Sequence, residues 1–119
     1  MFTCFIRYTI DPNKLEEFRE YARSWIALIN KYGGTHHGYF IPGTPMDNLP
    51  TPGFSFPGLG AEGPPNTAVA LFTFPSIEAY EEYRIGVADD DACKKATAKF
   101  NETHCFSRYE RSFLVPIFE

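Results

Sequence analysis

The sequence FTCFIRYTIDP at residues 2–12 decides the fold. Its first nine residues alternate between two sides of an extended chain, with Phe2, Cys4, Ile6, Tyr8 and Ile10 on one side and Thr3, Phe5, Arg7 and Thr9 on the other. Such alternation, with many aromatic and β-branched residues, predicts a β-strand over residues 2–10. Asp11 is a good helix N-cap, and Pro12 suits a first helical position because its missing N–H needs no partner there. The strand is therefore expected to lead directly into a helix.

The helix itself is indicated by an apolar stripe with steps of three and four residues. The stripe consists of Leu15, Phe18, Ala22, Trp25 and Ile29, and most charged residues of the segment lie outside it. Gly33-Gly34 supplies the left-handed cap with which many helices end. A second strand is predicted over residues 35–41, which completes a first β-α-β half.

Residues 42–66 differ in character from the rest of the chain. They hold seven Pro and five Gly, too many for a helix or a central strand. They also hold the large apolar residues Met46, Leu49, Phe54, Phe56 and Leu59. A loop of this length in a small domain is often functional. We expect it either to close over a cavity as a lid or to wrap around a partner subunit, and the stiffness of proline-rich chain favours wrapping.

The second half repeats the alternation of strand and helix. TAVALFTF at residues 67–74 predicts a third strand with both faces buried, because both parities are nearly apolar. Ser76 is expected to cap a helix that runs through about Ala88, and Asp89-Asp90-Asp91 to cap a further helix. CFSRYERSFLVPIF at residues 105–118 predicts a long fourth strand.

Two βαβ halves predict an α+β fold, the ferredoxin-like split βαβ, with a four-stranded antiparallel sheet and helices on one face. Residues 1–119 are expected to form a single domain, with residues 43–66 as a Pro/Gly-rich loop insertion. The far face of the sheet would expose apolar side chains such as Phe5, which is rare on a monomer. A second copy under two-fold symmetry would cover it, so we expect a homodimer packed sheet to sheet, with a cavity between the sheets.

Composition narrows the classes of function. Aromatic residues make up 17% of the 119 residues, which excludes a disordered chain. The net charge of −4 argues against nucleic acid or an anionic membrane as a partner. No stretch is apolar enough for a membrane span and no secretory signal is visible, so a cytoplasmic location is expected.

Cys4, Cys93 and Cys105 are an odd number at wide spacing, which fits neither a disulfide framework nor a zinc site, and core positions are expected for them.

Three segments resemble bacterial NIPSNAP-domain proteins: GGTHHGYF at residues 33–40, ALFTFPS at residues 70–76 and RYERSFL at residues 108–114. The opening CFIRYTIDP at residues 4–12 fits the same family. The resemblance spans nearly the whole chain and departs at about residues 43–65, where the family loop is usually shorter. It implies the dimeric α+β barrel superfamily, which includes cofactor-independent monooxygenases, haem-degrading enzymes and small-molecule isomerases. For the NIPSNAP branch itself it implies a fold and no established reaction.

His36 and His37 are the candidate catalytic residues. Neighbouring side chains of a strand point to opposite faces, so the pair is not expected to bind one metal ion, and no metal site is predicted. A histidine that faces a cavity can act as a general base near neutral pH or donate to a ligand carbonyl. Which of the two faces the cavity stays open at this point.

The candidate ligand-binding residues are Arg7, Tyr39, Arg108, Tyr109 and Arg111. Arg7 lies on the strand face expected at the dimer interface, where it either pairs with Glu110 or recognises a ligand carboxylate or enol oxygen. Tyr39 is expected on the same strand face as His37. On the last strand Arg108 shares a face with Glu110, and Tyr109 shares the other with Arg111. The alternation of the strand does not show which of the two pairs faces the cavity. The alternative to ligand binding is that these residues form a hydrogen-bond network at the dimer interface.

These features predict a homodimeric α+β barrel that binds a small apolar or aromatic molecule in its cavity, with no cofactor. Whether it is an enzyme stays open. The first alternative is a cofactor-independent monooxygenase or isomerase of a phenolic or enolisable substrate, with a histidine as base and an arginine that stabilises the oxyanion. The second alternative is haem binding, which needs a cavity histidine as axial ligand. Trp25 is expected to be a core residue of the helix stripe.

Overall fold

Each βαβ half of the chain has the element order that periodicity and capping predict. The computed structural model describes residues 1–43 and 56–118. Its elements are β1 (Phe2–Ile10), a 3-10 turn η1 (Pro12–Lys14), α1 (Leu15–Lys31), β2 (Thr35–Phe40), β3 (Thr67–Phe74), α2 (Ile77–Ala88), α3 (Asp91–Thr103) and β4 (Phe106–Leu114).

Side-chain caps begin the helical segments where the sequence places them. Asp11 accepts a hydrogen bond from the Asn13 amide at 2.9 Å and starts the η1 turn that precedes α1. Ser76 accepts from the Ala79 amide at 3.1 Å and caps α2. Asp90 is the member of the aspartate run that caps α3. Each cap satisfies an N–H that the helix itself cannot pair.

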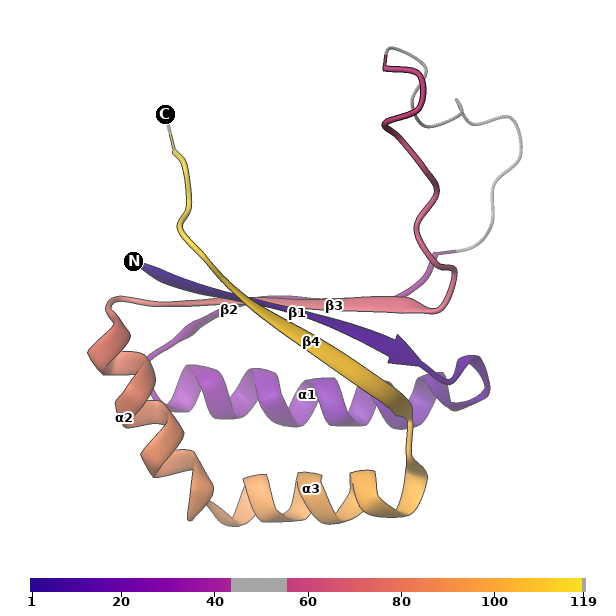
Figure 1. Cartoon of the computed structure of the whole chain (residues 1–119). Coiled ribbons are helices and arrows are strands. Elements are labelled where there is room, and N and C mark those ends of the chain that lie inside the picture. Colours follow the sequence, from indigo (N-terminus) through magenta and orange to yellow (C-terminus); the bar gives the residue numbers. More distant parts are fainter. Residues whose placement is uncertain (44–55, 119) are drawn as a thin grey trace.

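The four strands form one antiparallel sheet in the order β2-β3-β1-β4. All three α-helices cover the same face of this sheet (Figure 1). The predicted ferredoxin-like α+β fold is therefore confirmed. The opposite face is called the open face below, and its side chains include Thr3, Phe5, Arg7, His37, Phe40, Val69, Leu71, Thr73, Arg108, Glu110 and Leu114.

The core lies between the sheet and the helices. Phe18 of α1 and Phe74 of β3 are completely buried there, each within its own group of apolar side chains. Cys4 and Cys105 are buried as predicted, and Cys93 packs half-buried against the first group. Burial raises the pKa of the Cys4 thiol to about 11, so this thiol is neutral at pH 7.

The open face is apolar in its middle. Phe5, Val69 and Leu71 are half-buried in the single chain, and Phe40 is 56% exposed. The sequence predicts that both faces of β3 are buried, but in one chain only its helix-side residues are fully covered. A further partner would be needed to complete the burial of the other side.

The fourth strand is shorter than predicted. β4 ends at Leu114, which pairs with Thr3, and residues 115–118 leave the sheet. The reason is that β1 begins at Phe2, so almost no partner strand remains beyond this pair. Pro116, which has no N–H to donate, also opposes further pairing. This end of the chain rises on the side of the sheet away from the helices (Figure 1).

The lid and wrapping hypotheses for the Pro/Gly-rich loop fall largely on residues 44–55, outside the described residues. Met46, Leu49 and Phe54 are among those residues. Phe56 and Leu59 are described and strongly exposed. Residues 56–66 rise on the side of the open face (Figure 1). Within the described ranges, no helix is long and apolar enough to cross a membrane.

Candidate functional site

A bulge in β2 decides where the two neighbouring histidines point. His36 pairs with Phe72 and Gly38 pairs with Leu71, so His37 is an extra residue without a counterpart in β3. Gly38 has a φ of 114°, which an L side chain rarely adopts. The bulge puts His36 and Tyr39 on the helix side of the sheet, where their rings stack at 5.0 Å. The expectation that Tyr39 shares a face with His37 is therefore wrong, because the bulge interrupts the alternation on which it rested.

His36 is a half-buried, neutral histidine. Its Nδ1 accepts a hydrogen bond from the Gly38 amide at 2.9 Å, which leaves the proton on Nε2. Burial, with a smaller contribution from His37, lowers the pKa of His36 to about 4. Its buried Nε2 has no hydrogen-bond partner among the described residues.

His37 lies on the open face. Its Nε2 is 2.9 Å from the Thr73 Oγ1, and that hydroxyl is 3.1 Å from the Thr3 Oγ1. The histidine pair thus points to opposite faces of the sheet. In residues 1–43 and 56–118, no cluster of three or more His, Cys, Asp or Glu side chains could hold a metal ion.

Arg7, Arg108 and Glu110 form a group of charges on the open face. The Arg7 Nη2 lies 2.9 Å and 3.0 Å from the two carboxylate oxygens of Glu110, and the Arg108 Nη2 lies 3.4 Å from one of them. The Arg7 guanidinium lowers the pKa of Glu110. The ion pair that the sequence offered as one interpretation of Arg7 is therefore present, and both of its side chains are about half exposed, at 48% each.

A cavity of about 150 Å³ lies between the sheet and the helices and is called the inner cavity. Side chains from both layers line it, among them Tyr8, Tyr39, Tyr109 and Arg111 from the sheet, Tyr21 and Trp25 from α1, and Tyr80, Tyr83 and Arg84 from α2. It holds six of the seven tyrosines in the chain. Because Arg84, Tyr109 and Arg111 are exposed, its mouth faces the β4 edge. The sequence predicted a cavity between two sheets; this one lies on the opposite side of the sheet, within one chain.

The charges around the inner cavity are of one sign. Arg84 and Arg111 line it and no carboxylate does, among the residues that the structure describes. The Arg111 Nη1 donates to the Tyr80 hydroxyl at 3.1 Å. Unlike Arg7 and Arg108, neither cavity arginine forms an ion pair with a carboxylate in that part of the chain. The inner cavity is therefore locally positive in a chain whose net charge is −4.

Four of the cavity phenols are neutral hydrogen-bonding groups because they are buried. Burial raises the pKa of Tyr8, Tyr21, Tyr39 and Tyr83 above the ordinary tyrosine value. The Tyr8 and Tyr39 hydroxyls lie 3.4 Å apart. At neutral pH each of these four phenols keeps its proton, so it can donate to an acceptor in the cavity. Aromatic walls, phenol donors and two guanidinium groups favour an aromatic molecule that carries an oxyanion.

The structure divides the sequence-predicted residues between two places. Tyr39, Tyr109 and Arg111 come together in the inner cavity, whereas Arg7, Arg108 and His37 lie on the open face. Tyr109 thus lies on the helix side of the sheet together with Arg111. The sequence left open which pair of residues of this strand faces the cavity, and it is this pair. None of the three histidines of the chain lines the inner cavity.

Sequence reasoning missed Tyr8, Tyr21, Tyr80, Tyr83 and Arg84, and it placed Trp25 in the core. Trp25 does pack, half-buried, against the first core group, and it also forms part of the cavity wall; its buried Nε1 has no acceptor among the described residues. One feature of the sequence could have indicated some of these residues. Tyr21 and Trp25 are four residues apart, as are Tyr80 and Arg84, so each pair lies on one helix face.

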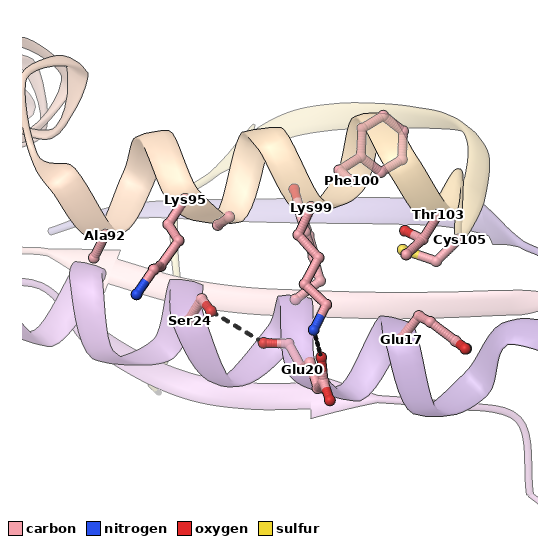
Figure 2. A pocket seen from close by; sticks show the side chains of 11 residues that line it. Glu17, Glu20, Ser24, Ala92, Lys95, Lys99, Phe100, Thr103 and Cys105 are labelled. Atoms are coloured by element: carbon pink, nitrogen blue, oxygen red, sulfur yellow. Dashed lines mark hydrogen bonds and ion pairs between the residues drawn. The ribbon is translucent and has the colours of Figure 1, made fainter.

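A second hollow, called the outer cleft, separates α1 from α3. It measures about 220 Å³. Figure 2 shows Lys95 and Lys99 reaching from α3 towards α1, and the Lys99 Nζ lies 2.5 Å from a Glu20 carboxylate oxygen. This contact lowers the pKa of Glu20. Charges of both signs thus surround the outer cleft, in contrast to the inner cavity.

Comparisons with known proteins agree with this fold. Residues 3–44 match the NIPSNAP family model. The resemblance to the NIPSNAP family is confirmed by this match over β1, α1 and β2. A search of curated proteins found no match.

Solved structures with the same fold include NIPSNAP proteins. An uncharacterized NIPSNAP domain protein from Burkholderia xenovorans has 18% sequence identity and a TM-score of 0.69, over 99% of this chain and 96% of that chain. A NIPSNAP family protein from Agrobacterium tumefaciens has 19% identity and a TM-score of 0.68, over 98% and 86%. A putative antibiotic biosynthesis monooxygenase from Nitrosomonas europaea has 8% identity and a TM-score of 0.62, over 99% and 100%. At these identities the likeness shows the fold.

Proposed function

We propose that this NIPSNAP-like chain is a homodimeric binding protein for a small aromatic anion, which it holds in the inner cavity. The observation that carries the proposal is the composition of the cavity wall. It combines six tyrosines, one tryptophan and two arginines with no carboxylate, in the part of the chain that the structure describes. Aromatic rings supply stacking surfaces, and the phenols and guanidinium groups supply donors for an oxyanion.

Arg111 is the residue expected to recognise the anion. It is held by its hydrogen bond to Tyr80, and its guanidinium also lies 5.0 Å from the Phe113 ring centroid. These contacts orient the group without neutralising its charge. Arg84 adds a second positive charge from α2.

Titration of Trp25 fluorescence with benzoate tests the proposal. Trp25 is the only tryptophan of the chain and lines the cavity, so its emission reports directly on occupancy. Benzoate is expected to change the emission saturably, and benzyl alcohol, the neutral analogue, to bind more weakly. Arg111→Gln is expected to weaken benzoate binding by about tenfold, the effect of losing a charge-assisted hydrogen bond. Arg23→Gln makes the same charge change at an exposed site on α1 and should have no effect. Equal binding of benzoate to all three proteins would refute the proposal.

The homodimer belongs to the same proposal. A second copy facing the open face would cover Phe5, Val69 and Leu71, whose burial one chain leaves incomplete. The exposed apolar residues Val115, Ile117 and Phe118 extend on the same side of the sheet and offer further contact surface (Figure 1).

A cofactor-independent monooxygenase of phenolic substrates is the second candidate. It is supported by the fold shared with the putative antibiotic biosynthesis monooxygenase and by the aromatic cavity. Its test is oxygen uptake with a panel of quinols, where Arg111→Gln should reduce turnover. Because the described cavities contain no histidine, His36→Ala and His37→Ala are not expected to abolish it directly. The haem alternative needs a histidine as axial ligand, and neither of these cavities contains one.

A further inference from the structure

Tyr21 is the one residue, among those the structure describes, that lines both the inner cavity and the outer cleft. On the inner side its ring centroid lies 6.1 Å from that of Tyr8 and 6.2 Å from that of Trp25. On the outer side it lies 6.3 Å from that of Phe100 on α3. The Tyr21 ring therefore forms part of the wall of both spaces.

We propose that Tyr21 is the specificity-determining wall of the binding site: it limits the ligand of the inner cavity to a short aromatic acid, and the outer cleft is the space into which a longer one would extend. This inference rests on the proposed function, since it describes the end of the same site. We expect that removal of the Tyr21 ring would join the cavities of about 150 Å³ and about 220 Å³, because this ring lines both of them.

The wall is held in place by its neighbours. The Tyr21 ring lies against Phe18 at 6.0 Å in a stacked arrangement and meets Phe106 edge-on at 5.2 Å. Phe18 is completely buried and Phe106 nearly so, which leaves these rings little freedom to move. The position of Tyr21 is thus set by packing on both the helix and the sheet.

The outer cleft suits the uncharged part of an elongated acid. Beyond Tyr21 its surface includes Ala92, Ala96 and Phe100 of α3, and small alanine side chains leave room between the helices. Its charged residues are of both signs, and Lys99 is paired with Glu20. It therefore attracts a carboxylate less than the inner cavity does, where only arginines carry charge. A long aromatic acid is expected to place its carboxylate at Arg111 and its far ring in the outer cleft.

Tyr21→Leu tests the wall with two acids of different length. The measured quantity is the affinity for biphenyl-4-carboxylate relative to benzoate, from Trp25 fluorescence. This ratio is expected to rise by about tenfold in the variant, because a second ring gains burial in the opened cleft. Tyr21→Phe keeps the ring and should keep the preference for the short acid. Tyr21→Ala is a second variant that removes the ring. Near-UV circular dichroism checks that each protein is folded.

Filling the outer cleft provides the matched control. Ala92→Phe, made in the Tyr21→Leu background, places a ring where the far end of the long acid should lie and is expected to reverse the gain. Ala98→Phe adds the same bulk to an exposed residue of α3 outside the cleft and should leave the gain intact. A wild-type protein that already binds the long acid better than the short one, or a gain that Ala92→Phe does not reverse, would overturn the inference.

Collisional quenching of Trp25 by acrylamide separates failure of this inference from failure of the proposed function, because it needs no bound acid. Opening the wall is expected to increase quenching in Tyr21→Leu, and Ala92→Phe to lower it again. If benzoate does not bind but quenching follows this pattern, Tyr21 is the wall of a cavity with another ligand. If benzoate binds to the wild type and quenching in Tyr21→Leu stays at the wild-type level, the wall is refuted and the proposed function stands.

Discussion

His36 shows how surroundings set the chemistry of a single residue. Its ring packs against Tyr39 and Phe72, and burial lowers its pKa from 6.5 to about 4. The unfolded chain takes up a proton on this histidine near its ordinary pKa, whereas the folded chain resists protonation until a lower pH. Acidification through this window therefore favours unfolding. The stability that the neutral ring contributes is complete above pH 6.5 and is lost as the pH falls towards 4.

We predict that His36→Asn flattens this pH dependence. Asparagine retains an acceptor for the Gly38 amide and does not titrate. Urea unfolding at about pH 7.5 and about pH 5 should show a smaller loss in the free energy of unfolding for the variant than for the wild type. His104→Asn is the control, because His104 is exposed and its left-handed φ of 48° suits asparagine. An equal flattening in both variants would contradict the role of His36.

At the scale of the elements, α1 and α2 approach each other closely at one point. A Cβ on Gly86 of α2 would lie 2.7 Å from the Tyr32 ring, which follows the end of α1. The Tyr32 hydroxyl donates to an Asp90 carboxylate oxygen at 2.7 Å and lies 3.3 Å from the Gly86 carbonyl oxygen. The glycine therefore allows a contact that ties the end of α1 to α2 and to the cap of α3.

Gly86→Ala is expected to lower the free energy of unfolding by about 2 kcal/mol, because overpacking outweighs the better helix propensity of alanine. In a Tyr32→Leu background the same substitution should cost less, since the ring it would strike is gone. Urea unfolding of the four proteins forms a double-mutant cycle that measures the difference. A cost that is equal in both backgrounds would show that Tyr32 is not the cause.

At the scale of the whole molecule, the open face is the proposed dimer interface. Light scattering is expected to give twice the chain mass of 13.5 kDa. Leu71→Arg places a charge in the middle of the open face and should shift the protein towards the monomer. Ile85→Arg, at a residue of α2 that is 75% exposed, is the matched control and should leave the dimer intact. A wild-type monomer at all concentrations would contradict the proposed dimer.

The sequence by itself determined the order of the elements, their caps and the fold class, because periodicity and capping are local properties that a few neighbouring residues express. Asp11, Ser76 and the aspartate run begin their helical segments where predicted. Local pattern also indicated that Arg7 and Glu110 could pair, since each lies on a predictable strand face.

Only the tertiary structure decided the site. The bulge at His37 moved Tyr39 to the helix side. Gly38 is compatible with a bulge, but a glycine within a strand does not by itself require one. The inner cavity assembles residues from β1, α1, β2, β3, α2 and β4, from Ile6 to Arg111, so its members are neighbours in space and distant in sequence. Packing between layers creates such a cavity, and packing depends on the whole chain at once. For the same reason the helix stripe predicted that Trp25 packs against the core, as it does, but not that it also lines a cavity.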